Sequence, residues 1–196
     1  RILIYPFFAF ILVLTAILYP ISGSWQWGGG WLSEMGFSDF AGSTIVHSVG
    51  GWAALIGALV LGARKGKFND DGTANVMPGS SIPMATLGVW ILWLGWFGFN
   101  GASQLALGSY EDADSVATIF ANTSMAAAGG VLAPMILSRI MYGKTDIGAT
   151  LNGAIAGLVS ITAEPLTQSI GQAIIKGGIG LSLIHIYEPT RLDGIA

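Results

Sequence analysis

Long uninterrupted apolar runs constrain this chain more than any other feature of its sequence. Residues 1–22 contain a single charged residue, Arg1, and are otherwise rich in Ile, Leu and Phe. A run of about 18 or more apolar residues can cross a bilayer as an α-helix, in which every backbone polar group is satisfied internally. The sequence therefore predicts an integral membrane protein of the all-α class.

The composition agrees with this class and excludes several kinds of function. The chain is 53% hydrophobic and 10% charged, with 29 glycines in 196 residues, and its mean hydropathy is +0.66. It has no cysteine, so disulfides, zinc–thiolate sites and thiol catalysis are excluded. The net charge of −3 comes without a basic stripe, so no nucleic-acid partner is indicated.

The apolar periodicity predicts a polytopic membrane helical bundle of about six spanning helices. The expected helices are 1–22, 39–62, 82–105, 115–142, 147–163 and one that begins near residue 169. A Gly-rich loop with three tryptophans follows the first helix, and tryptophans at the edge of an apolar run are typical of the membrane interface. A polar loop at 63–81 separates the second and third helices.

The basic residues predict an orientation, because Lys and Arg concentrate in cytoplasmic loops. The loops at 23–38, 104–114 and 164–168 contain neither Lys nor Arg. The N-terminus and the loops that alternate with these three carry the basic residues Arg1, Arg64, Lys65, Lys67, Arg139 and Lys144. The N-terminus is therefore expected in the cytoplasm, and the Trp-rich loop outside.

Both ends of the chain are unusual. The first residues have no Met and no signal peptide of the usual three-part form, so a truncated start is expected. The tail 181–196 resembles the translation of a sequencing-library adaptor, and we exclude it from the fold as non-native. The alternative is a native helix that ends at Pro189. His185 lies in this tail and is discounted for the same reason.

His47 is the strongest candidate for a functional residue. It lies inside the apolar segment that follows Asp39, and ionisable groups at membrane depth are costly and usually functional. Ser43 and Thr44 lie one helical turn before it, and their small size leaves room for a lumen. The alternative is a core imidazole that ties two helices together by a hydrogen bond. Asp39 itself is expected to cap the helix.

A second pattern runs along the third expected helix. The spacings of Leu92, Trp96, Phe99 and Ser103 are four, three and four, so these residues share one helical face. A stripe of aromatic rings that ends at a serine hydroxyl suits the binding of a small cation that loses its water, since cation–π attraction contributes about 0.5–2 kcal/mol. Trp27 in the outer loop would supply another ring. The alternative is helix packing and an interfacial belt.

These motifs resemble the signature of the ammonium transporter family, the Amt/MEP/Rh superfamily. The resemblance covers residues 1–180, and its most specific blocks are Asp39–Leu55 and Leu94–Ser103. Further blocks are Leu61–Phe68, Ala121–Thr123 and Leu151–Thr162. It implies a fold of eleven spanning helices in two inverted halves and a homotrimer with one pore per subunit. This chain then corresponds to helices four to eight and the start of nine.

The resemblance also implies roles for the candidate residues. Trp27, Phe99 and Ser103 correspond to an outer ammonium-recruitment site. Leu92 and Trp96 correspond to the pore entrance and its lining, His47 to the first of two pore histidines that relay protons, and Asp39 to a structural support of the outer site. The implied activity is ammonium transport in the cell membrane without a cofactor or metal, and the protein is not expected to be an enzyme.

The chain departs from the family pattern at several points. The second pore histidine and the other gate phenylalanine belong to helices that this chain does not contain, and Lys144-Thr-Asp stands where the family has Lys-Pro. The chain alone is therefore not expected to conduct. An ammonium sensor and a structural membrane fragment stay open as alternatives. The candidate partners are ammonium, the lipid bilayer and a cytosolic regulator.

Overall fold

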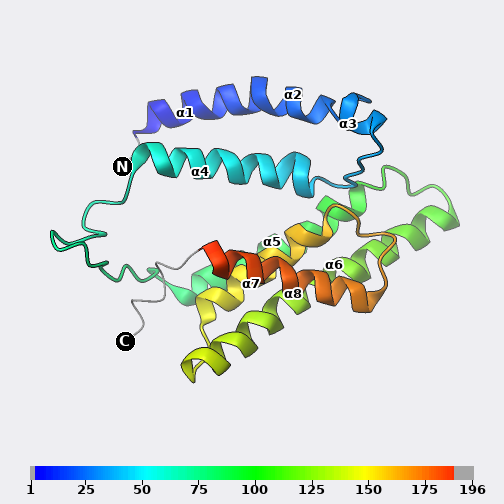
Figure 1. Ribbon diagram of the computed structural model, residues 1–196. Helices are drawn as coiled ribbons and strands as arrows, with labels where there is room; N and C mark the ends of the chain where they lie inside the picture. Colours follow the sequence, from blue (N-terminus) through cyan, green and yellow to red (C-terminus); the bar gives the residue numbers. More distant parts are fainter. Residues whose placement is uncertain (1–2, 188–196) are drawn as a thin grey trace. The chain divides into compact units, whose positions relative to one another are not determined.

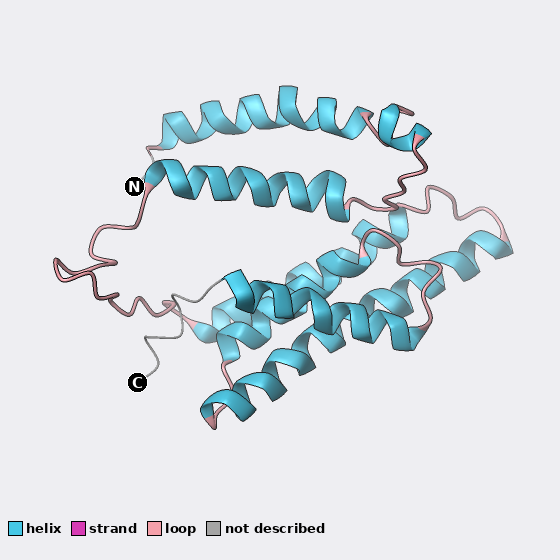
Figure 2. Cartoon of the chain, in the orientation of Figure 1, coloured by secondary structure: helices cyan, strands magenta, loops and turns pink. Residues whose placement is uncertain are grey.

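The computed structural model describes residues 3–187, with side chains described as far as residue 180 (Figure 1). Figure 2 shows helices joined by loops, and within the described residues the only β pairing is an isolated bridge between Phe68 and Ala74. The predicted all-α class is therefore confirmed. The chain divides into two compact units, Gly79–Pro189 and the remainder, and each is described by itself.

The first unit begins with one long helix, Ile4–Ser24. It comprises α1 (Ile4–Val13), a π-helical segment η1 (Leu14–Leu18) and α2 (Tyr19–Ser24). Pro20 lies in the first turn of α2, where it cannot donate a backbone hydrogen bond and its ring crowds the preceding turn. The wider π-turn just before it accommodates this local change.

The second long helix of this unit is Ser43–Leu61. Its first part is a π-helical segment, η2 (Ser43–Ser48), and its second is α4 (Val49–Leu61). Figure 1 shows it beside the first helix, and the contacts between them involve α2 and η2, including Gly23 against Ile45. A short helix, α3 (Trp31–Glu34), lies in the loop that joins them.

The described residues of the second unit form four helices, which Figure 1 labels. They are α5 (Ile82–Ala102), α6 (Tyr110–Tyr142), α7 (Ile147–Ile161) and α8 (Ile170–Tyr187). Helices α6, α7 and α8 pack against one another, and α5 packs against α6 and α7. The buried centre of α6 holds mainly small residues, including Ala126, Ala127, Gly129 and Gly130.

Small residues let these helices approach until their backbones touch, as helices in lipid commonly do. A Cβ placed on Gly153 would overlap the carbonyl oxygen of Gly130, and one on Gly157 would overlap that of Ala126. On α8, Gly177 is pressed in the same way against Ala126. The Gly153-xxx-Gly157 pair therefore serves packing within the chain.

Several predicted helix boundaries were wrong. The second helix begins at Ser43 rather than residue 39, because Asp39 caps it from outside the helix. Helix α6 begins at Tyr110 rather than 115, because Ser109 and Asp112 form a capping box that draws the acidic residues into the first turn. Helices α5 and α7 end at Ala102 and Ile161, a few residues earlier than expected.

Among the described residues, four helices are long and apolar enough to cross a membrane: Ile4–Ser24, Ser43–Leu61, Ile82–Ala102 and Tyr110–Tyr142. Helix α7 is apolar but shorter. The described backbone of α8 ends at Tyr187, so the last part of the adaptor-like tail, 188–196, lies outside the described residues, as do the side chains from 181 onward, His185 included.

Candidate functional site

Asp39 organises the start of the helix that carries His47. One carboxylate oxygen accepts hydrogen bonds from the backbone N–H groups of Gly42 and Ser43, both at 2.9 Å. The other accepts from Thr44 at 2.7 Å and from Ile45 at 2.9 Å. One buried carboxylate, 1% exposed, thus satisfies four N–H groups that a helix start leaves without intrahelical partners.

Trp27 is fastened to the same helix start. Its indole N–H donates to the backbone carbonyl of Asp39 at 2.8 Å. The edge of its ring lies against Gly42, whose φ of +108° favours glycine; a Cβ there would come within 3.1 Å of the ring. The Trp27 side chain is nevertheless 45% exposed. Its ring is therefore held in place while part of its surface stays accessible.

His47 lies in the π-helical segment that follows this capped start. Its backbone N–H donates to the carbonyl of Gly42, five residues back, at 3.0 Å. Such π-turns widen a helix locally and are frequent at functional sites. The side chain is half-buried, and the positions of Gly50 and Gly51, one turn further on, are open on their side-chain side.

In the second unit, two rings of the predicted α5 stripe are in contact. The ring centroids of Trp96 and Phe99 are 5.5 Å apart with an angle of 35° between the planes. Trp96 is 8% exposed and packs in the core with Ala127 and Leu158, whereas Phe99 is 38% exposed. The pair thus has a buried member that anchors it and an accessible member.

The other two stripe residues lie on either side of this pair. Ser103 is the C-cap residue that follows α5. Its hydroxyl donates to the carbonyl of Phe99 at 2.8 Å, which leaves its oxygen lone pairs free to accept. Leu92 is 51% exposed. The stripe therefore runs from an exposed apolar residue through a buried indole to a hydroxyl at the helix end. Trp27, Asp39 and His47 belong to the other unit.

Several polar residues that sequence reasoning missed surround the aromatic pair. The indole N–H of Trp96 donates to the hydroxyl of Thr162 at 2.9 Å. The Asn100 amide, fully buried, donates to Thr123 at 3.0 Å, while its Oδ1 has no partner among the described residues. No periodicity or spacing relates these pairs, since their partners are 66 and 23 residues apart.

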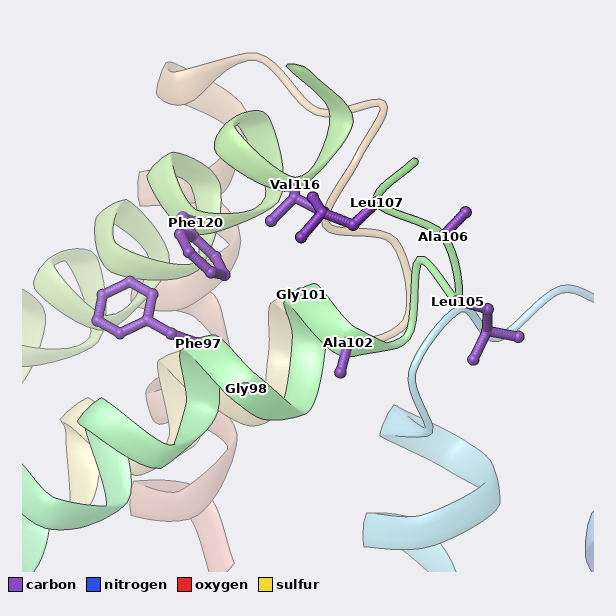
Figure 3. A pocket seen from close by; sticks show the side chains of 9 residues that line it. All are labelled: Phe97, Gly98, Gly101, Ala102, Leu105, Ala106, Leu107, Val116 and Phe120. Atoms are coloured by element: carbon purple, nitrogen blue, oxygen red, sulfur yellow. The ribbon is translucent and has the colours of Figure 1, made fainter. Parts of the chain in front are cut away.

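An apolar groove of about 490 Å³ lies where α5 ends and α6 begins (Figure 3). Phe97 and Phe120 pack edge to face there, with centroids 5.1 Å apart, and Gly101 leaves room for the Phe120 ring. The rest of its lining is Gly98, Ala102, Leu105, Ala106, Leu107 and Val116. None of the predicted substrate residues lines this groove. Within the described part of the chain, no cluster of His, Asp and Glu could hold a metal ion.

The long apolar helices of the described chain define a multi-pass membrane protein. Residues 1–190 match the family model described as the Ammonium Transporter Family, so the chain belongs to this family. It is 43% identical over 177 residues to the ammonium transporter Amt2 of Archaeoglobus fulgidus, covering 85% of this chain and 37% of that protein. It is 40% identical over 167 residues to an ammonium transporter of Aquifex aeolicus, covering 85% of this chain and 36% of that protein.

Solved structures give the same family. A structure described as a sensor Amt protein is 40% identical with a TM-score of 0.82, over 88% of this chain and 43% of that one. The crystal structure of Mep2 from Candida albicans is 31% identical with a TM-score of 0.82, over 93% of this chain and 39% of that one. The chain thus spans between 36% and 43% of the length of these relatives.

Proposed function

We propose that the protein containing this chain moves ammonium across a cell membrane. The observation that carries the proposal is the arrangement of side chains on α5. The Trp96 and Phe99 rings are in contact, and the Ser103 hydroxyl lies next to them at the end of the helix. Its location in a block shared with the ammonium transporter family, and the names of the relatives, support the choice of substrate.

Ammonium is recruited at the outer site by Trp27, Phe99 and Ser103. Trp27 and Phe99 each keep an accessible ring surface, and aromatic faces attract cations by about 0.5–2 kcal/mol, more where water is excluded. The Ser103 oxygen, already oriented by its bond to the Phe99 carbonyl, accepts one ammonium N–H. Asp39 supports this site because its backbone carbonyl accepts the hydrogen bond from the Trp27 indole N–H.

The pore beyond this site carries neutral ammonia. A bare cation in an apolar lumen costs many kcal/mol, whereas a small neutral molecule loses little on leaving water. Ammonium therefore gives up its proton near the entrance lined by Leu92 and Trp96, the proton enters the relay that starts at His47, and neutral ammonia passes Phe99. His47 offers hydrogen bonds within the pore and forms the first part of a proton relay.

The context of this activity follows from the same resemblance. The protein is a homotrimer in the cell membrane, the N-terminus of this chain is cytoplasmic, and a cytosolic protein is a candidate regulator. The reaction is transport, with no bond-breaking catalysis and no cofactor. The chain by itself carries one pore histidine, His47, and does not conduct.

An ammonium sensor is a second candidate, favoured by the similarity to the structure described as a sensor Amt protein. In that case the same pore gates a signalling domain elsewhere in the reading frame. A signalling domain in the full reading frame supports the sensor, and its absence supports the transporter. If the membrane segment is purely structural, the intact gene gives no ammonium-dependent growth or current.

Ammonium-evoked currents in liposomes test the proposal, with the full reading frame that contains this sequence as the protein. His47→Ala is expected to abolish or alter proton-coupled uptake, because it removes the imidazole from the relay. Ser48→Ala, the adjacent position in the same π-helical segment, is the control and should retain the wild-type current. Unchanged electrogenic transport by His47→Ala would exclude the relay role.

A further inference from the structure

The indole of Trp96 is held by a residue from a different helix. Its N–H donates to the hydroxyl oxygen of Thr162 at 2.9 Å, and Thr162 is the C-cap residue that follows α7. Both side chains are buried, Trp96 at 8% exposed and Thr162 at 0%. A hydrogen bond in such surroundings is not exchanged with water, so the direction of the indole is fixed by where Thr162 lies.

The orientation of the Thr162 hydroxyl is itself determined. Its proton is donated to the backbone carbonyl of Leu158, one turn earlier in α7, at 2.7 Å. A hydroxyl has one proton and two lone pairs, so this bond leaves the oxygen available only as an acceptor. The indole N–H, which can only donate, is the matching partner. The three groups form a directed chain from Trp96 through Thr162 to Leu158.

This chain of bonds affects the accessible ring as well. Phe99 lies 5.5 Å from Trp96 at a fixed tilt of 35°, and Ser103 bonds back to the Phe99 carbonyl. Tilted aromatic pairs are favoured by the ring quadrupoles, so a shift of one ring shifts the other. The Thr162 hydroxyl thus holds the indole against which the Phe99 ring rests.

We propose that Thr162 is a positioning residue for ammonium recognition. Its hydroxyl fixes the Trp96 indole, and the indole in turn positions the Phe99 ring. This inference rests on the proposed function, since it assigns a role within the same site. It differs from a purely structural role in its consequence. Loss of packing alone lowers the amount of folded protein, whereas misplacement of the rings lowers the affinity for ammonium.

Three substitutions in the full reading frame separate these consequences. Thr162→Val keeps the shape and removes the hydroxyl, while Thr162→Ser keeps the hydroxyl. Thr150→Val is the matched control on the same helix, because the Thr150 hydroxyl also donates to a carbonyl one turn earlier, that of Asp146 at 2.7 Å. Ammonium-evoked currents, normalised to the folded protein in the liposomes, give the half-saturating ammonium concentration for each.

Thr162→Val is expected to raise the half-saturating ammonium concentration about three- to tenfold, the range for the loss of one buried hydrogen bond. Thr162→Ser and Thr150→Val should remain near wild type. In a Trp96→Phe background, which already lacks the indole N–H, Thr162→Val should add no further change. An equal change in both backgrounds overturns the proposal, as does an unchanged half-saturating concentration in Thr162→Val.

A second measurement reports on the indole without transport. With 5-fluorotryptophan incorporated and the Trp96 resonance assigned by its loss in Trp96→Phe, Thr162→Val should shift that ¹⁹F resonance and Thr162→Ser should not. A normal wild-type current with no ¹⁹F shift overturns the positioning role alone. A wild-type protein that gives no ammonium current overturns the proposed function, and the recognition role of Thr162 with it.

Discussion

The two units hold their buried polar groups in different ways. At the start of the Ser43–Leu61 helix, a single carboxylate satisfies four backbone N–H groups within six residues of itself. In the four-helix unit, buried polar side chains are paired across helices, as in Trp96 with Thr162 and Asn100 with Thr123. The first arrangement is local in sequence, and the second depends on helices that must already be packed.

This difference determines which changes each region tolerates. The local cap depends on one side chain, so its loss leaves several donors unsatisfied at once in a region where water is scarce. The packed unit distributes its stability over close backbone approaches, such as Gly153 against Gly130, and each polar pair adds a smaller amount. The predictions below test this contrast directly.

Asp39→Ala should have the largest effect on stability. It removes four charge-assisted hydrogen bonds from a buried helix start. Because water can replace only part of them, we expect the free energy of unfolding to fall by on the order of 4 kcal/mol. The free energy of unfolding in mixed micelles, measured by denaturing-detergent titration, gives the value.

Asp146→Ala is the matched control for this cap. Asp146 also caps a helix, α7, but through one bond to Ala149 at 3.0 Å and in a partly exposed position. Its removal should cost only about 1 kcal/mol, the usual value for a helix cap. Equal losses for the two substitutions would contradict the idea that the number and burial of the bonds distinguish the two caps.

Gly153→Ala should produce the next largest effect, in the other unit. The added methyl group would overlap the backbone carbonyl of Gly130, which cannot move aside as a flexible side chain could. Overpacking of this kind costs about 1–3 kcal/mol, and the melting temperature in detergent should fall accordingly.

Gly88→Ala provides the comparison within the same unit. Gly88 lies in the interior of α5, and open space surrounds its side-chain position. Alanine forms helices better than glycine by about 1 kcal/mol, so the melting temperature should stay the same or rise. A similar decrease in both variants would show that the close contact between α6 and α7 is not what makes Gly153 sensitive.

Much of the fold was predictable from the sequence because its signals are local. The apolar runs identified the helices, and Asp39 was expected at a helix start from its position before an apolar segment. The π-helical form of Ser43–Ser48 was not predictable, since apolar spacing does not separate a π-turn from an α-turn over six residues. The start of α6 was missed because acidic residues were assigned to a loop rather than to a capping box.

The candidate site was predictable only in part for the same reason. The spacing of Trp96 and Phe99 correctly indicated neighbouring rings on one helical face. Spacing could not show that Trp96 is buried while Leu92 is exposed, because burial depends on where α6 and α7 lie. Nor could it identify Thr162, whose partner is 66 residues away.

The smallest predicted effect concerns Asp71, an exposed carboxylate that accepts hydrogen bonds from a residue close in sequence. Asp71 lies in the loop 62–81 between α4 and α5. It accepts a hydrogen bond from the Thr73 hydroxyl at 2.6 Å and another from the Thr73 backbone N–H at 2.9 Å. These bonds, the hydroxyl first, lower the pKa of Asp71 below its ordinary value. Thr73→Val should raise it again, as followed by ¹³C NMR titration of the carboxyl carbon, and Thr73→Ser should not.

The sign of the pH dependence follows from this lowered pKa. The bonds favour the charged form in the folded loop, so their stabilisation is present above the pKa of an unfolded aspartate and is lost as the pH falls through the folded pKa. At neutral pH it is constant. Because Asp71 is fully exposed, water competes for the same bonds and Thr73→Val should leave the melting temperature unchanged. A loss comparable to that of Asp39→Ala would mean that burial is not what gives the Asp39 cap its strength.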